Sequence, residues 1–155
     1  MQKEIEKKYN ELRGRFGLPE FKEMDIELEI SDFEETNFLL RAIIRGISEK
    51  IDFYSTMIGE ILQPDTANLY AMHETRCLDE EEKSDMYNLY RKLMDFNRQS
   101  TEISLELNEK GEAEFINGFF SEWKGLKKEL LNFVRKMRAS WKIEADIKED
   151  VGYLG

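Results

Sequence analysis

The chain has 155 residues, a formal net charge of −10 and a single cysteine, Cys77. This length suits one domain with a sizeable core, and a lone thiol, which excludes an internal disulfide framework, leads us to expect a cytoplasmic location. The first thirty residues hold no signal-peptide run, and no window reaches the roughly 18 apolar residues of a membrane span, so membrane insertion is not expected. The negative charge opposes non-specific attraction to nucleic acid and anionic lipid.

The N-terminal region is predicted to contain a short helix followed by an extended acidic segment. Apolar side chains recur at spacings of four and three through the first sixteen residues, which predicts a helix over about 2–15. After the first proline, apolar and charged residues alternate strictly from Met24 to Ile30, which is the periodicity of a strand. Residues 17–31 are therefore expected to be extended, either lying across the helices or pairing with a partner chain.

The first long helix is predicted over about 32–62. Ser31 and Glu34 have the spacing of a capping box at its start. A coiled-coil seam with a 4-3 alternation follows, and eight of its nine positions are apolar: Phe33, Asn37, Leu40, Ile44, Ile47, Ile51, Tyr54, Ile58 and Ile61. Such a seam has to pack against another helix.

Three further helices follow the second proline. The periodicity predicts a short helix near 66–77, a long one over about 80–108 and a last one over about 112–149. Asp79 and Glu82 form a second capping-box pattern before the middle one of these. The last helix has the most regular apolar seam of the chain.

Glycines recur every seven residues along this last helix, at Gly111, Gly118 and Gly125. A glycine inside a helix costs about 1 kcal/mol relative to alanine. Either a neighbouring helix or chain approaches this edge closely, or the glycines are tolerated at the surface, and the sequence leaves both explanations open.

His73 and Cys77 lie one helical turn apart and could supply two ligands of a metal. A structural zinc site needs four ligands, and the chain has no other histidine or cysteine. The pattern therefore favours a partly buried helix face, and the sequence predicts no metal site and no cofactor.

Paired carboxylates are the remaining candidates for chemistry, because all-α nucleotide hydrolases hold Mg²⁺ with acidic side chains inside a bundle. The pairs with suitable spacing are Asp79 with Glu82, Glu109 with Glu112, and Asp146 with Glu149. All of them fall at predicted helix ends, where acids ordinarily cap the helix. A Mg²⁺-dependent nucleotide hydrolase therefore stays an alternative, and no catalytic residue is predicted.

Two charged blocks are the most conspicuous surface features of the sequence. Residues 20–35 hold eight acids and one base, whereas residues 124–142 hold seven bases and one acid. Partner-binding residues are predicted in both blocks: Ile26, Leu28, Ile30, Lys124, Lys128, Arg135 and Lys142. The basic stripe gives a second alternative, nucleic-acid binding, which the net charge and the lack of a stacking aromatic in the stripe oppose.

Taken together, the patterns predict an all-α single domain over residues 1–155, an elongated up-down bundle of three long helices. Its apolar surface exceeds what three helices cover among themselves, which predicts a homo-oligomer, most simply a homodimer. The predicted function is a non-catalytic interaction or assembly module with an unidentified protein partner.

Overall fold

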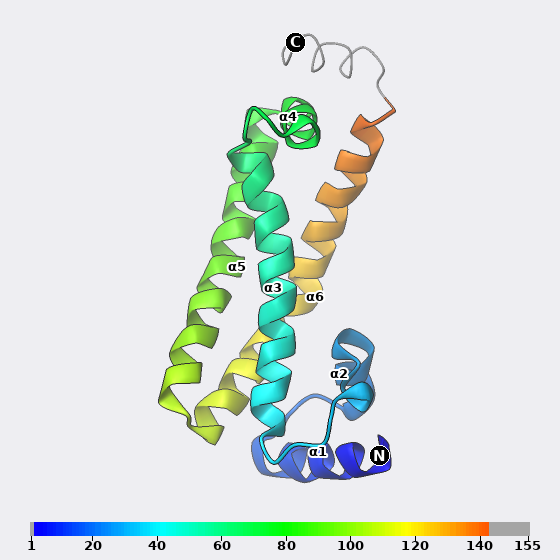
Figure 1. Cartoon of the computed structure of the whole chain (residues 1–155), viewed down its shortest axis with the longest axis vertical. Helices are drawn as coiled ribbons and strands as arrows, with labels where there is room; N and C mark the ends of the chain where they lie inside the picture. Colours follow the sequence, from blue (N-terminus) through cyan, green and yellow to red (C-terminus); the bar gives the residue numbers. More distant parts are fainter. Residues whose placement is uncertain (1, 143–155) are drawn as a thin grey trace. The chain divides into compact units, whose positions relative to one another are not determined.

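The computed structural model describes residues 2–142, and in this part the chain is an all-α helical bundle (Figure 1), as predicted. Its six α-helices are α1 (Gln2–Phe16), α2 (Phe21–Leu28), α3 (Leu39–Leu62), α4 (Leu69–Arg76), α5 (Glu80–Glu106) and α6 (Glu109–Ser140). A 3₁₀ turn lies at Ile30–Asp32, and the described residues form no strand. No helix among them is long and apolar enough to cross a lipid bilayer.

The described residues divide into two compact units. Unit 1 holds the residues up to Ile51 together with Phe96–Lys124, and unit 2 holds Asp52–Asp95 together with the residues from Gly125 onward. The three long helices each contribute one part to each unit, and the units are described separately below. That the whole chain is one domain stays a prediction.

Unit 1 is built on parts of α3, α5 and α6, with α1 running crosswise at their ends (Figure 1). The Phe96 ring of α5 packs edge-on against Phe119 of α6, with centroids 5.5 Å apart. A short turn joins these two helices, so they are antiparallel. Along α3, Arg41 pairs with Glu112 and the Lys50 amine lies over Trp123. In these two contacts the residue number increases in the same direction along α3 and α6, so the two helices are parallel, as up-down topology requires.

Helix α1 is anchored in unit 1 by Tyr9, whose side chain is fully buried. Its hydroxyl donates a hydrogen bond of 2.5 Å to the Pro19 carbonyl, and its ring packs edge-on against Phe21. Burial raises the pKa of the Tyr9 phenol far above its ordinary value. The predicted helix over 2–15 is thus present one residue longer, and its core side chain fixes the chain that leads into α2.

The predicted extended segment over 17–31 is wrong, because residues 21–28 form the helix α2. Phe21, Met24 and Leu28 follow helical spacings of three and four, a pattern that the strict alternation from Met24 obscured. Glu29 ends the helix in the left-handed region, with φ of 52°, and donates its backbone N–H to the Asp25 carbonyl. A short amphipathic run is compatible with both the strand and the helix periodicity. Packing against the rest of unit 1 favours the helix.

The first long helix begins at Leu39 instead of residue 32, so the predicted capping box is also wrong. The Ser31 N–H donates to the Asp25 carboxylate, which keeps this stretch bound to α2. The segment that follows is held to α1 by an ion pair between Lys8 and Glu35. Thr36 then accepts the N–H of Phe38 through its hydroxyl, just before the helix starts. These side-chain contacts therefore hold the segment in a non-helical conformation where the first two turns of the helix were predicted.

In unit 2, α4 closes the connection between α3 and α5. Asn68 caps it by accepting the Ala71 N–H, and the Thr75 hydroxyl donates 2.6 Å to the Ile61 carbonyl at the end of α3. The capping box before α5 is confirmed, because Asp79 and Glu82 each accept the other's backbone N–H at 2.8 and 3.1 Å. The buried apolar side chains of this unit are Ile58, Ile61, Ala71, Leu78, Met86, Leu89, Leu93, Leu126, Leu130 and Met137.

Helix α6 starts at Glu109, three residues earlier than predicted, because the Asn108 side chain accepts the Lys110 N–H at 2.9 Å. It ends at Ser140, and the predicted continuation over 143–149 lies outside the described residues. The three regularly spaced glycines of this helix, which we call the glycine edge, differ in their surroundings. A methyl group on Gly111 would lie 3.4 Å from Ile103, whereas one on Gly118 or Gly125 would meet nothing within 4 Å. Within this chain, only the first glycine has a close neighbour.

Candidate interaction surface

The structure separates the three apolar residues that the sequence placed on one partner surface. Ile26 is 69% exposed on α2, whereas Ile30 is fully buried in the core of unit 1. Leu28 is half-buried and lies against Gly46 of α3. The prediction that Ile30 contacts a partner is therefore wrong, because its side chain, at the start of the 3₁₀ turn Ile30–Asp32, is buried in the core. Ile26 alone remains fully available at the surface.

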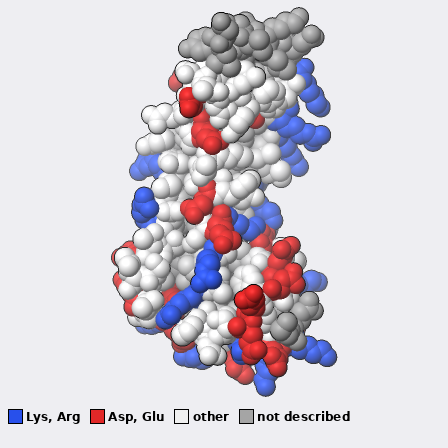
Figure 2. Space-filling view, viewed as in Figure 1, with Lys and Arg blue, Asp and Glu red and all other residues white. Residues whose placement is uncertain are grey.

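The acids around α2 also separate into two groups. Those that face the rest of unit 1 have basic partners: Glu20 pairs with Arg13, Glu27 with Lys50 and Glu35 with Lys8. The acids on the solvent side have no ion pair with a described residue, and we call them, with Ile26, the acidic patch: Glu23, Ile26, Glu29, Asp32 and Glu34. Figure 2 shows acidic side chains gathered over α2 and the residues that follow it.

All four residues of the predicted basic stripe are exposed, and Lys124 is the one member in unit 1. Lys128, Arg135 and Lys142 belong to unit 2, where Figure 2 shows Lys and Arg side chains along the side formed by α6. None of these three has an ion pair with a described residue. By contrast, Lys136 on the same helix pairs with Glu82.

Sequence reasoning missed the apolar members of this surface. Leu131 is 45% exposed and Val134 is 38% exposed, and Arg138 lies one turn beyond Val134. The 3-4-3 spacing of Lys128, Leu131, Arg135 and Arg138 places them along one side of α6, and Val134 adjoins them. We call this surface the basic face: Lys128, Leu131, Val134, Arg135 and Arg138, with Lys142 in the turn after the helix. Its spacing was readable in the sequence, but the larger buried seam masked it.

Comparisons with known proteins find no matching family model, no similar curated protein and no similar solved structure. The surfaces themselves must therefore carry any functional conclusion.

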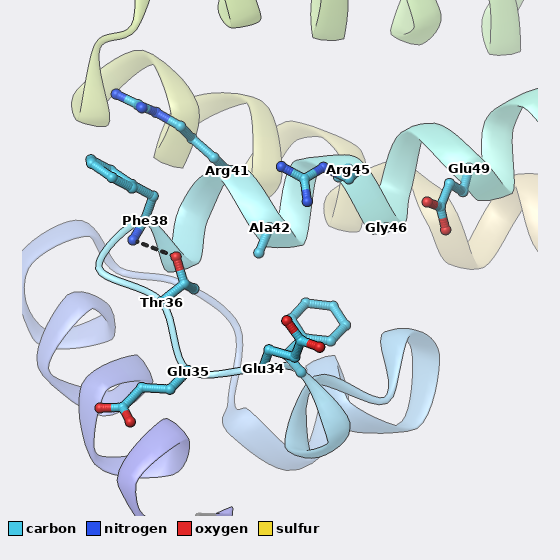
Figure 3. A pocket seen from close by; sticks show the side chains of 10 residues that line it. Glu34, Glu35, Thr36, Phe38, Arg41, Ala42, Arg45, Gly46 and Glu49 are labelled. Atoms are coloured by element: carbon cyan, nitrogen blue, oxygen red, sulfur yellow. Dashed lines mark hydrogen bonds between the residues drawn. The ribbon is translucent and has the colours of Figure 1, made fainter.

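A hollow of about 560 Å³ lies in unit 1 between the segment before α3 and the first turns of that helix (Figure 3). Glu34 from the segment and Arg45 from α3 stand on opposite sides of it, and Ala42 and Gly46 leave space in the helix wall. Its lining contains two arginines and three glutamates: Arg41, Arg45, Glu34, Glu35 and Glu49. This mixture of charges favours neither an anionic nor a cationic ligand.

A second hollow of about 310 Å³ in unit 1 is lined by residues of α1, α3 and α6. Four of its charged side chains pair with one another: Arg15 lies 3.3 Å from Glu109, and Arg41 lies 3.4 Å from Glu112. Glu112 is almost completely buried, so its charge is compensated by Arg41 and not by a bound cation. These pairs link the start of α6 to α1 and α3, and Glu11 is the one further carboxylate of the lining.

The remaining candidates for metal or catalytic chemistry have structural roles among the described residues. The His73 ring is fully buried, with Nε2 2.9 Å from the Ser140 carbonyl and its centroid 4.2 Å from that of Trp141. Asp79 and Glu82 form the cap of α5. Residues 2–142 contain no group of three or more metal-binding side chains. Asp146 and Glu149 lie outside the described residues.

Proposed function

We propose that this chain is a non-catalytic interaction module that binds an acidic amphipathic helix through the basic face of α6. One observation carries the proposal: two exposed apolar side chains, Leu131 and Val134, lie among bases that have no ion pair with a described residue. An apolar centre with a charged border is the usual composition of a helix-binding surface. The border selects partners by charge, and Leu131 and Val134 supply apolar area for burial.

The composition of the face favours a protein partner over a polyanion. Phosphate recognition needs bases, and single-stranded nucleic acid also needs aromatic side chains for stacking. The basic face has the bases but presents leucine and valine between them. The net charge of −10 further opposes binding to a duplex or an anionic membrane. A partner that is acidic only at its contact helix avoids much of this repulsion.

The test is fluorescence anisotropy with a labelled synthetic peptide that forms an amphipathic helix with leucines on one side and glutamates beside them. We expect saturable binding that weakens about tenfold or more in the Arg135→Glu/Arg138→Glu variant, because the reversed charges repel the peptide. Lys110→Glu is the matched control, since Lys110 is an exposed base near the start of α6, outside the basic face. Equal binding by the wild type and the double variant would refute the proposed surface.

The same preparation discriminates the two alternative functions. A labelled DNA duplex bound more tightly than the peptide, with loss on Lys124→Glu/Lys128→Glu, would replace the proposal by nucleic-acid binding. Mg²⁺-dependent turnover in a panel of nucleotides would replace it by the hydrolase. We expect neither result, because the bases alternate with apolar residues and the acid pairs of residues 2–142 are used in caps and ion pairs.

A further inference from the structure

The chain itself carries a helix of the kind that the basic face is proposed to bind. Helix α2 exposes Ile26 three residues after Glu23, and Glu29, the residue that ends the helix, is exposed three residues further along the chain. Asp32 and Glu34, which are also exposed, follow the helix along the chain, and Glu34 lines the hollow that faces Arg45. The patch thus has an apolar centre and four acids without an ion pair to a described residue.

We infer that the acidic patch of one copy binds the basic face of α6 in a second copy. This inference rests on the proposed function and identifies the partner as the chain itself. Four acids meet four bases, none of which has an ion pair with a described residue, and the bases are Lys128, Arg135, Arg138 and Lys142. Ile26 then packs against Leu131 and Val134, which removes apolar surface from water on both sides.

The dimensions of the two surfaces agree. Helix α2 has eight residues, and the helical part of the basic face extends over ten residue steps, which correspond to about 12 Å and about 15 Å at 1.5 Å per residue. Two chains with a net charge of −10 repel each other on average. Association therefore needs the complementary patches, and each copy has one patch of each kind.

Light scattering coupled to size-exclusion chromatography measures the self-association. At about 50 µM, a concentration suited to a contact of micromolar affinity, we expect a mass at or above twice the 18.4 kDa of one chain. The mass should fall toward one chain in about 0.5 M salt, because salt screens exposed charges. A wild-type chain that stays monomeric at low salt overturns the inference, whereas binding of the synthetic peptide would still support the proposed function.

Charge-swapped variants test which surfaces meet. The acid-to-base variant is Glu23→Lys/Glu29→Lys/Glu34→Lys, and the base-to-acid variant is Lys128→Glu/Arg135→Glu/Arg138→Glu. Each should be monomeric alone, because its two patches then have the same sign. Their mixture should associate, because the changed patch of the first variant is complementary to the changed face of the second, and the two unchanged surfaces keep their original opposite charges. A mixture that stays monomeric while both variants give a wild-type circular dichroism spectrum overturns the inference.

A single substitution gives the same test without a large change of charge. Ile26→Asp places a charge at the centre of the acidic patch and should reduce the associated mass to that of one chain. Leu105→Asp is the matched control, because Leu105 is 79% exposed in the same unit but lies outside α2. Dissociation by Leu105→Asp together with retained association of Ile26→Asp would place the contact elsewhere and overturn the inference.

Discussion

Helix α6 is buried to different extents in the two units. Six of the twelve residues from Glu112 to Trp123 are buried in unit 1, against four of the sixteen from Gly125 to Ser140 in unit 2. In unit 1, α1 and α2 add contacts: Asn117 donates to the Phe16 carbonyl and the Trp123 indole donates to Glu27. Contacts with additional helices, and not the apolar seam alone, therefore determine how much of α6 is buried in unit 1.

The largest expected effect comes from the covered part of α6. Phe119 is buried, stacks on Trp123 and packs edge-on against Phe96, so Phe119→Ala should lower the free energy of unfolding by about 3–5 kcal/mol. Leu131→Ala on the uncovered part should change it by only about 0.5 kcal/mol. Chemical denaturation of dilute protein measures both. Equal losses for the two variants would mean that the two parts of α6 are covered to the same extent.

A smaller loss of stability is expected at the end of α6, where His73 of α4 contacts Ser140 and Trp141. His73→Ala removes the donor to the Ser140 carbonyl and the ring that contacts Trp141, so the free energy of unfolding should fall by about 2 kcal/mol. Trp141 fluorescence should shift to the red as its ring loses this neighbour. His73→Gln is the comparison, since its amide can still donate. If the alanine variant matches the wild type in stability and emission, α4 does not fix the helix end.

The sequence predicted the long helices well, because their apolar seams extend over several turns and only one periodicity fits them. It failed over residues 17–38, where the runs are short. Met24 to Ile30 fits a strand as well as a helix, and the capping pattern at Ser31 has no helix after it because Ser31 is bound to Asp25. Patterns of this length are decided by tertiary contacts that a sequence does not display.

The sequence predicted only part of the basic face, again because tertiary contacts decide which apolar side chains are buried. Lys128 and Arg135 were identified from charge alone, and charge on a helix is usually exposed. Leu131 and Val134 were not identified, because an apolar residue beside a seam is ordinarily assigned to the core. Which apolar residues stay exposed depends on the tertiary contacts of the folded chain, which the sequence does not display.

A substitution of Tyr9 tests how strongly α1 is held in unit 1. Tyr9→Phe removes the hydrogen bond to the Pro19 carbonyl and should cost about 1 kcal/mol at neutral pH. Because burial raises the pKa of the folded phenol, its stabilising contribution is complete below the ordinary value near 10 and decreases as pH rises above it. The difference in unfolding free energy between wild type and variant should therefore shrink at alkaline pH. A constant difference from pH 8 to about 11 would contradict this assignment.

The smallest effects are expected at Gly118 and Gly125, one in each unit, and they should increase stability. Neither position has an atom within 4 Å of an added methyl group, so alanine should raise the unfolding free energy by about 0.5–1 kcal/mol through helix propensity alone. Thermal unfolding measures the gain, and Gly111→Ala is the contrast, because its methyl group would contact Ile103 at 3.4 Å and add packing to the propensity effect. If Gly118→Ala or Gly125→Ala instead reduces the self-associated mass without loss of folding, a second copy approaches the glycine edge. The contact between copies would then involve that edge of α6 in addition to the basic face.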